Sequence, residues 1–386
     1  MIRLAKKTLI ISSFAPPMKG ASPHFLYTLF SNFDASSYGI YTDQRASDET
    51  LAHPRLVGPY YYFATRVAGG FFLTRAYRRA RAFIRAVREG LRIIREEQYT
   101  LLLGTADRGE GLILMYVLSW LSRTPYALYF LDLYRWNHFG GVWDIIARFF
   151  EPVLFRGARA IVVMGDGHKA FYERRYGTRF SYTVVRNCAL PPRTRVHTPR
   201  VEAPYVIMYS GGMYWPQERA IRNLITAVTD IDLPVELWLY TPSGLARFEA
   251  EFKDNPRIVF RSAPQEAMAD IQDDATILFL PLSFNTPSPE VIEMATPGKT
   301  VEYLIAERPI LVHAPPYAFI SRYAKEKGFA HVVDTEVSKD LQDGIRRIIQ
   351  DTAYATQLVS RARELYTLEY NLVANAQAFA TRIAQI

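Results

Sequence analysis

Short apolar runs alternate with longer stretches that carry apolar residues at helical spacing. A continuous apolar run of this length is typical of a strand that is buried on both faces of a sheet. In the first half such runs occupy residues 7–15, 100–106, 126–133 and 160–166, and in the second half residues 205–212, 235–241, 257–263, 276–283 and 308–316. Strands that alternate with helices predict a parallel sheet, and two such sets predict two doubly wound domains. The predicted class is therefore α/β, with two Rossmann-like domains that face a cleft.

A proline-rich segment divides the two sets of strands. Residues 191–204 hold four prolines and no apolar periodicity, which is typical of an interdomain linker. We therefore predict an N-terminal domain over 1–195 and a C-terminal domain over 205–365. Residues 366–386 then form a final helix, whose apolar stripe runs through Leu372, Ala376, Phe379 and Ile383.

Charge is distributed unevenly between the halves. Residues 1–200 hold 29 Lys and Arg against 14 Asp and Glu, whereas residues 201–386 hold 17 against 24, which together give the net charge of +8. The first half is therefore expected to attract anionic partners.

The single cysteine, Cys188, excludes an intrachain disulfide and fits a reducing compartment. The apolar start of the chain is short and lacks a small-x-small cleavage site, so we interpret it as a buried strand. The longest apolar run, residues 111–121, is too short to span a bilayer. The expected location is the cytoplasm, with peripheral attachment to the inner face of the membrane as an open question.

Parallel sheets of this kind bind ligands beyond the carboxyl ends of their strands. The segments that follow the predicted strands are rich in Gly, Pro, aromatic and charged residues. They are residues 15–24, 105–111, 132–141, 210–219, 262–266 and 283–299.

One of these segments leads into a short predicted helix that carries Lys299 and Glu302. Thr296 suits the N-cap and Pro297 the first helical position. The helix N-terminus and Lys299 would then attract phosphate, and Glu302, on the same face, could accept both hydroxyls of a ribose. The alternative is a surface ion pair between Lys299 and Glu302, which stabilises a protein little.

Five motifs together resemble a known family, the retaining GT-B glycosyltransferases of family 4. The resemblance covers nearly the whole chain in order. It implies that the domain over 1–195 binds the acceptor, that the domain over 205–365 binds the nucleotide sugar, and that the final helix over 366–386 crosses back to the first domain. Its motifs are FAPPMKGASPHFLYTL (14–29), YTVVRNCAL (182–190), YSGGMYWPQERAIRNLITAV (209–228), DDATILFLPLS (273–283) and PGKTVEYLIAERPIL (297–311).

The resemblance implies a site for a nucleotide sugar. Its implied donor-binding residues are Gly20, Gly211, Gly212, Arg219, Ser262, Glu290, Glu293, Lys299, Thr300 and Glu302. The family often has a first glutamate where this chain has Met294, which leaves Glu290 and Glu293 as neighbouring candidates. Met213 stands where the family often has an arginine, with Gln217 or Arg219 near the place of a lysine. Lys19 lies beside the Gly20-Ala21 pair.

By the same resemblance, the reaction is glycosyl transfer with retention of configuration, and neither a metal nor another cofactor is expected. Implied catalytic residues are Lys299, which would stabilise the leaving diphosphate, Asp132, which would orient or deprotonate an acceptor hydroxyl, and His24, which would touch donor or acceptor. For Asp132 and His24 the alternative is a structural cap. Asp107 and Glu110 are weaker candidates of the same kind.

The acceptor side carries an arginine-rich helix, predicted over residues 71–98. Phe83, Ile84, Val87, Leu91 and Ile94 recur at helical spacing. Such a helix beside exposed aromatics could lie on an anionic bilayer and serve a lipid-linked acceptor or a cell-surface glycan precursor. The alternative is a solvated basic face.

Two other functions remain open. One is a noncatalytic nucleotide- or nucleic-acid-binding protein of the same fold, although no nucleic-acid module is recognisable and nucleic acid is not expected as a partner. The other is a nucleotide-sugar 2-epimerase, which usually needs more carboxylates and histidines in the cleft.

Overall fold

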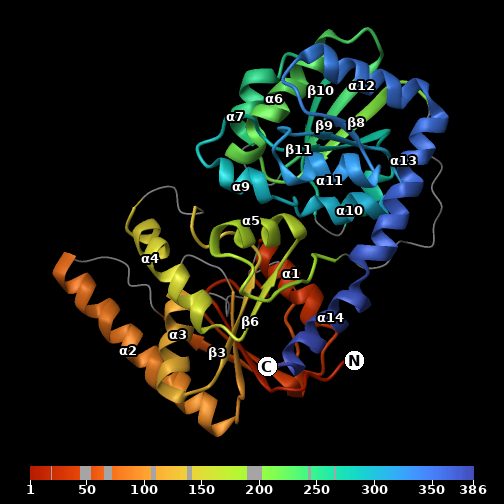
Figure 1. Cartoon of the computed structure of the whole chain (residues 1–386). Helices are drawn as coiled ribbons and strands as arrows, with labels where there is room; N and C mark the ends of the chain where they lie inside the picture. The colour runs from red at the N-terminus through yellow and green to blue at the C-terminus, as the bar shows by residue number, and fades with distance from the viewer. Residues whose placement is uncertain are drawn as a thin grey trace. The chain divides into compact units, whose positions relative to one another are not determined.

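The chain folds into two compact units. The computed structural model describes residues 1–18, 20–43, 54–64, 72–105, 110–136, 141–188, 202–241, 245–264 and 267–386 (Figure 1). Unit 1 comprises Met1–Cys188 together with Leu372–Ile386, and unit 2 comprises Ala189–Asn371. The predicted linker at 191–204 lies almost entirely outside the described residues.

Unit 1 is built on a parallel sheet of seven strands in the order β3-β2-β1-β4-β5-β6-β7. The strands are β1 (Thr8–Ser12), β2 (Tyr38–Asp43), β3 (Tyr60–Phe63), β4 (Leu101–Thr105), β5 (Tyr126–Phe130), β6 (Ala160–Val163) and β7 (Tyr182–Val184). Strands β1, β4, β5 and β6 are buried along their whole length, because helices cover both faces.

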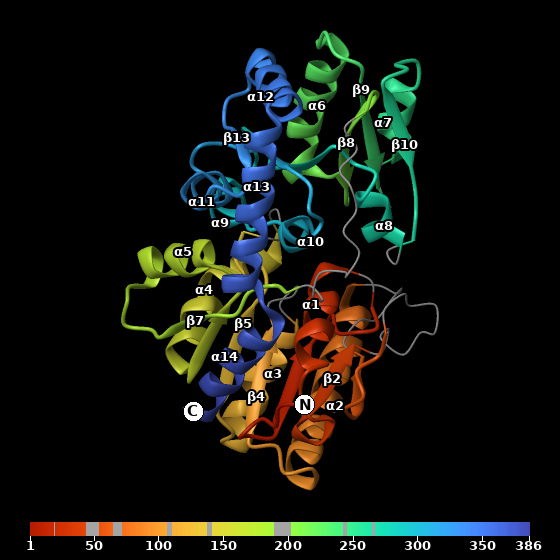
Figure 2. The same ribbon diagram turned by 90° about the vertical axis from the view of Figure 1, so that its right-hand side faces the viewer.

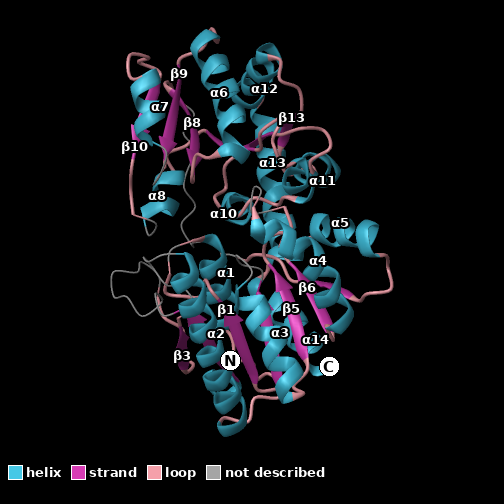
Figure 3. Cartoon of the chain, turned by 90° about the vertical axis from the view of Figure 1, so that its left-hand side faces the viewer, coloured by secondary structure: helices cyan, strands magenta, loops and turns pink. Residues whose placement is uncertain are grey.

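The helices of unit 1 form two layers around the sheet. They are α1 (Ala21–Phe30), α2 (Phe72–Glu96), α3 (Glu110–Ser122), α4 (Val142–Gly157), α5 (Asp166–Tyr176) and α14 (Leu372–Ala384), with a short 3-10 turn, η1 (Ala35–Ser37). Helices α2, α3 and α4 lie side by side (Figures 1 and 3). Helix α14 packs beside α1 on the sheet (Figure 2).

Unit 2 has a six-stranded parallel sheet in the order β10-β9-β8-β11-β12-β13. The strands are β8 (Tyr205–Ser210), β9 (Val235–Tyr240), β10 (Ile258–Arg261), β11 (Ile277–Pro281), β12 (Ile310–His313) and β13 (His331–Val333). The chain reverses its direction of travel across the sheet between β8 and β11, which are neighbours in space but distant in sequence.

The helices of unit 2 connect these strands or follow the last of them. They are α6 (Trp215–Asp230), α7 (Leu245–Phe252), α8 (Met268–Gln272), α9 (Pro289–Met294), α10 (Lys299–Ile305), α11 (Phe319–Lys327), α12 (Ser338–Gln350), α13 (Thr352–Leu365) and the π-helical turn η4 (Tyr366–Tyr370). Two apolar cores, one on each face of the sheet, bury these helices against the strands.

The predicted α/β class with two doubly wound sheets is confirmed, with three strands beyond those predicted. The periodicity missed β2, β3 and β13. Strand β2 mixes tyrosine with Gly, Thr and Asp, β3 consists of three tyrosines and a phenylalanine, and β13 has three residues. The aromatics expected to be exposed before the arginine-rich helix are in fact β3. Phe63 is buried, and the Tyr60 hydroxyl donates to the Pro16 carbonyl oxygen at 2.9 Å.

The arginine-rich helix, α2, ends close to its predicted bounds, and its predicted apolar stripe is partly covered. Ile94 is buried and Phe83, Val87 and Leu91 are half-buried, whereas Ile84 is 50% exposed. Among the described helices, none combines the length and the apolar character needed to cross a bilayer.

Candidate functional site

The switch point of unit 2 lies between the neighbouring strands β8 and β11, where the strand order of the sheet reverses. Two loops meet there: the Ser283 N–H donates to the Pro216 carbonyl oxygen at 2.6 Å, and the Arg219 N–H donates to the Ser283 hydroxyl at 3.0 Å. Open parallel sheets bind ligands at such a point, so the topology alone selects this edge of unit 2.

A glycine turn follows β8 at this edge. Gly211 has φ +148°, in the region that favours glycine. A Cβ at this position would lie 3.9 Å from Lys299 Cε. The side chain of Lys299 therefore passes beside the turn, so the structure brings together two of the predicted donor-binding residues.

Lys299 and Glu302 form an ion pair on α10. Their Nζ and Oε2 atoms are 2.9 Å apart, and the side chains are 23% and 26% exposed. The predicted same-face arrangement is present, and so is the ion pair foreseen as the alternative. Such a pair stabilises a protein little, and each partner is near enough to solvent to exchange the other for a ligand.

Helix α10 begins two residues later than the sequence indicated, so the predicted N-cap at Thr296 is wrong. Gly298 is the N-cap, with φ −56° and ψ −29°. The Pro297 carbonyl oxygen accepts the Thr300 N–H at 2.9 Å, which makes a turn of the Thr-Pro-Gly segment in front of the helix.

Buried contacts hold α10 against the end of β8. The Tyr303 hydroxyl accepts the Ser210 N–H at 3.2 Å, and both residues are fully buried. Thr300 is 1% exposed, and its hydroxyl has no hydrogen-bond partner among the described residues. An unsatisfied buried hydroxyl is uncommon and suits a segment that meets a polar ligand.

Arg219, a predicted donor-binding residue, is engaged by an acidic partner. Its guanidinium pairs with Glu336, and Asn285 donates to the same carboxylate at 3.3 Å. Arg219 could contact a diphosphate only by leaving Glu336. Gly212 lies in the turn after β8, where its carbonyl oxygen accepts the Tyr209 hydroxyl at 2.6 Å.

The remaining donor candidates lie on other elements. Ser262 is exposed just after β10, which β9 separates from β8. Glu290 and Glu293 are half-buried on α9, and Met294, in the place of the family's first glutamate, is 5% exposed and packs in the core.

In unit 1 the structure joins two predicted segments. Asp132 follows β5, and Ser22, in the first turn of α1, donates a hydrogen bond to its carboxylate. Desolvation raises the pKa of Asp132 to about 6, and this hydrogen bond opposes the shift. The residue is exposed, so the shift reflects crowding by nearby protein rather than full burial.

Gly20 and His24 belong to the same corner. Gly20 is the N-cap of α1 with φ 139°, and its carbonyl oxygen accepts the His24 N–H at 3.2 Å. His24 is half-buried on the helix. Glu110, one of the two weaker candidates, begins α3 and is half-buried, whereas Lys19 and Asp107 lie outside the described residues.

The sequence analysis missed a buried carboxyl group at Glu151. Its side chain lies on the buried face of α4 and is completely buried. Oε2 accepts the Arg135 N–H at 3.2 Å, and Oε1 accepts the Tyr176 hydroxyl. Glu151 therefore ties the loop that carries Asp132 to α4. The signal was a lone glutamate in the apolar run FFEPVLF, residues 149–155.

Burial raises the pKa of Glu151 to about 8, and the hydrogen bond from Tyr176 opposes the shift. Since the folded-state pKa lies above the unfolded value of 4.5, unfolding releases a proton between these limits, and stability falls as pH rises. The pKa values of the facing hydroxyls, Tyr172 and Tyr176, are raised by burial, so they stay protonated in this range.

We expect Glu151→Gln to remove this dependence. From pH 5 to pH 7 the wild type should lose about 2 kcal/mol relative to the variant, at roughly 1.4 kcal/mol per pH unit. Urea denaturation of both proteins across this range measures the difference, and buried histidines cancel in it. Parallel curves would show that Glu151 is ionised in the folded protein.

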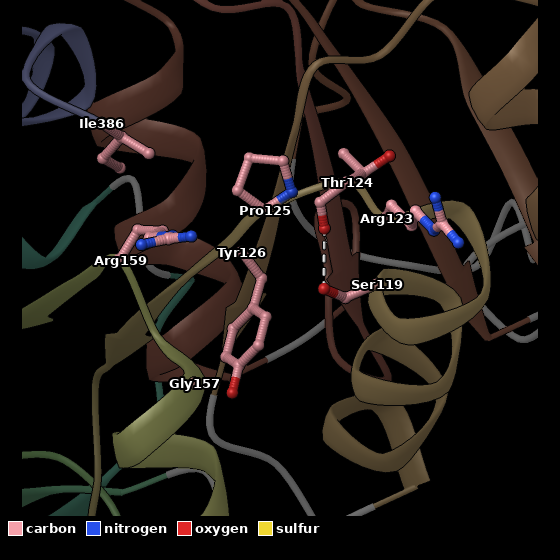
Figure 4. Close-up of a pocket in the computed structure, with 8 residues that line it drawn as sticks. All are labelled: Ser119, Arg123, Thr124, Pro125, Tyr126, Gly157, Arg159 and Ile386. Atoms are coloured by element: carbon pink, nitrogen blue, oxygen red, sulfur yellow. Dashed lines mark hydrogen bonds between the residues drawn. The ribbon is translucent and has the colours of Figure 1, made fainter.

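A cavity of about 370 Å³ lies elsewhere in unit 1 (Figure 4). Ser119, Arg123 and Tyr126 line it together with Arg159 and Ile386. It opens at the amino end of β5, the opposite end from Asp132, and is therefore separate from the candidate site. Among the described residues, no group of His, Cys, Asp and Glu side chains has the arrangement of a metal site.

The two parallel sheets with their flanking helices have the GT-B fold. The structure of Anabaena Alr3699/HepE in complex with UDP and glucose is similar to the chain at 14% identity, with a TM-score of 0.71, over 99% of this chain and 100% of that one. Sucrose-phosphate synthase from Thermosynechococcus elongatus matches at 14% identity and a TM-score of 0.69, over 99% and 98%. The apo form of the lipopolysaccharide outer core galactosyltransferase WaaB matches at 12% identity and a TM-score of 0.63, over 99% of both chains.

No protein-family model matches the sequence, and no curated protein matches it. The likeness therefore lies in the fold.

Proposed function

We propose that this protein is a retaining glycosyltransferase that moves a sugar from a nucleoside diphosphate sugar to a glycan or lipid-linked acceptor. One observation carries the proposal: the Lys299–Glu302 pair lies beside the Gly211 turn, at the switch point of the unit 2 sheet. A cation and a carboxylate at this place match the two ends of a ribose diphosphate.

The donor would replace the ion pair with two ligand contacts. Lys299 would bind the diphosphate, and Glu302 would accept hydrogen bonds from the ribose hydroxyls. Gly211 has no side chain, so the donor can approach the backbone of this turn. A residue with a side chain would be strained there by the φ of +148°. Uridine is the first base to test, since the HepE structures contain UDP or UDP-glucose.

The acceptor would lie against unit 1. Asp132 is exposed, has a raised pKa and is oriented by Ser22, which suits a group that positions an acceptor hydroxyl or takes its proton. Stabilisation of the leaving diphosphate by Lys299 would supply much of the rate without a metal. Retention of the anomeric configuration is tested by proton NMR of the product from a donor of known configuration.

Glu302→Ala tests the donor site. We expect it to weaken UDP binding by about 1.5–3 kcal/mol, measured by titration calorimetry, because a charge-assisted contact to the ribose is lost. A 3′-deoxy analogue of UDP should bind the two proteins more nearly alike. Pyrophosphate should bind the variant at least as tightly as it binds the wild type, because Lys299 is freed from its ion pair with Glu302.

Asp334→Ala is the matched control. Asp334 is 23% exposed and pairs with Lys325 at 2.6 Å on the same unit, so this variant removes another ion pair without touching Lys299 or Glu302. Equal UDP affinity in wild type and Glu302→Ala would contradict the assignment. UDP binding with no hydrolysis or transfer of any UDP-sugar would favour the noncatalytic alternative.

A further inference from the structure

Helix α4 exposes an apolar stripe. Val142, Ile145 and Phe149 are 69%, 61% and 71% exposed, and their spacing places them on one face of the first two turns. The opposite face of α4 carries the buried Ala147 and Glu151. Single exposed apolar residues are ordinary, whereas three on one stripe form a patch that needs an explanation.

Helix α2 exposes positive charge close to the same end of the unit. Every residue from Thr74 to Arg81 is exposed, so this part of the helix has no packed face. It has no acidic residue in its first turn, although a helix N-terminus favours negative charge. Seven arginines of α2 make no ion pair with any described residue: Arg75, Arg78, Arg79, Arg81, Arg85, Arg88 and Arg95.

The two surfaces lie near the carboxyl ends of the strands of the unit 1 sheet. Helix α2 follows β3 and α4 follows β5, so each begins near the carboxyl ends of the parallel strands. Helix α3 lies between them, packing on α2 and contacting α4 through Tyr116 and Phe150, whose ring centroids are 5.2 Å apart (Figure 3). Asp132 follows β5 at the same edge.

We propose that this face of unit 1 docks on an anionic lipid bilayer, with the α4 stripe inserted at the acyl boundary and the α2 arginines on the headgroup phosphates. Apolar insertion beside lipid-facing arginines is the usual chemistry of a peripheral membrane surface. Because Asp132 lies at this edge, docking would bring an acceptor carried on a lipid to the residue proposed to orient it. This last step rests on the proposed function, whereas the docking does not.

Charge selects the bilayer over a second copy of the chain. A symmetric dimer through this face would bring two sets of unpaired arginines together, and like charges across an interface are costly. Anionic headgroups neutralise the arginines instead.

The test uses sedimentation with phosphatidylcholine vesicles, with and without phosphatidylglycerol. We expect the wild type to bind the anionic vesicles. A triple variant should partition onto these vesicles about tenfold more weakly; it combines Val142→Ser, Ile145→Ser and Phe149→Ser. Arg78→Gln, Arg79→Gln, Arg81→Gln and Arg85→Gln combined should lower the partition by about 100-fold or more at low salt. Serine variants of Val337, Leu368 and Val373, which are 54%, 71% and 66% exposed, should bind like the wild type.

A site-specific label reports insertion directly. Cys188 is the single cysteine, so Phe149→Cys in a Cys188→Ala background carries one environment-sensitive dye. Its emission should shift to the blue on anionic vesicles, and a dye at Val373→Cys should not respond.

The proposal is wrong if the wild type stays in solution with both vesicles at low salt, or if the α4 serine variant binds as well as the wild type. It is also wrong if the wild type binds no vesicle and the α4 serine variant differs from it in oligomeric state, because the stripe would then be a contact between copies of the chain. UDP-sugar hydrolysis without vesicles should be equal in all these proteins. If the wild type hydrolyses no UDP-sugar, the proposed function is contradicted and the docking result still holds.

Discussion

Ending the chain at Asn371 is expected to leave an insoluble protein. The deletion removes α14, whose buried side chains are Asn375, Ala376, Phe379, Ala380 and Ile383. The Phe379 ring contacts Phe30, Phe33 and Tyr129 at centroid distances of 5.5, 5.7 and 6.0 Å. Loss of such a helix would cost a large share of the roughly 5–15 kcal/mol that stabilises a domain, and would leave these rings exposed.

Phe379→Ala measures the same contact in the full chain. We expect it to lower the free energy of unfolding by about 3–5 kcal/mol, through lost burial and the cavity left behind. Val373→Ala, on the exposed side of α14, is the control and should change stability by less than about 0.5 kcal/mol. A soluble truncated protein with the unfolding midpoint of the wild type would show that α14 does not stabilise unit 1.

Lys299→Ala is expected to lower turnover by about 10²–10³-fold while changing donor affinity little. The negative charge on the leaving diphosphate grows as the sugar bond breaks, so a fixed cation stabilises the transition state more than the bound donor. The variant also releases Glu302 from its ion pair. Steady-state rates with saturating UDP-sugar, together with calorimetry for UDP, separate the two effects.

Lys325→Ala is the control for this variant. It breaks another lysine–carboxylate ion pair on the same unit, so an effect of general stability would appear in both proteins. An equal loss of affinity and turnover in Lys299→Ala would mean that the lysine binds the donor without favouring the transition state. Unchanged turnover would remove Lys299 from the reaction.

Apolar runs predicted nine of the thirteen strands in the described part of the chain, because most strands buried on both faces carry a continuous apolar sequence. Strand β2 is an exception, because it is buried along its whole length and yet carries Gly, Thr and Asp. The rule does explain the other two misses. Strand β3 lies at an edge of its sheet with partly exposed tyrosines, and β13 is a short edge strand, so neither required such a run. A further strand, β7, was indicated by its motif before the linker.

The candidate site was predicted only in part. Helical spacing predicted that Lys299 and Glu302 share one face of their helix. The strand order, which the sequence did not give, places the helix near the switch point of the sheet. Three contacts depend on where the side chains point in the folded protein. They are the Lys299–Glu302 pair, the Arg219–Glu336 pair and the hydrogen bond from Ser22 to Asp132. For residues on different elements, spacing along the chain does not determine these directions.

By itself, the sequence determined the two α/β sheets, the uneven charge and the loops that can carry chemistry, because these depend on periodicity and composition. Only the tertiary structure decided which groups are buried and which are left uncovered. Glu151 and Phe149 are two residues apart on one helix, yet the first is sealed in the core and the second is 71% exposed. The physical reason is that α4 turns one face to the sheet, and an apolar residue on its other face stays in solvent unless a partner covers it.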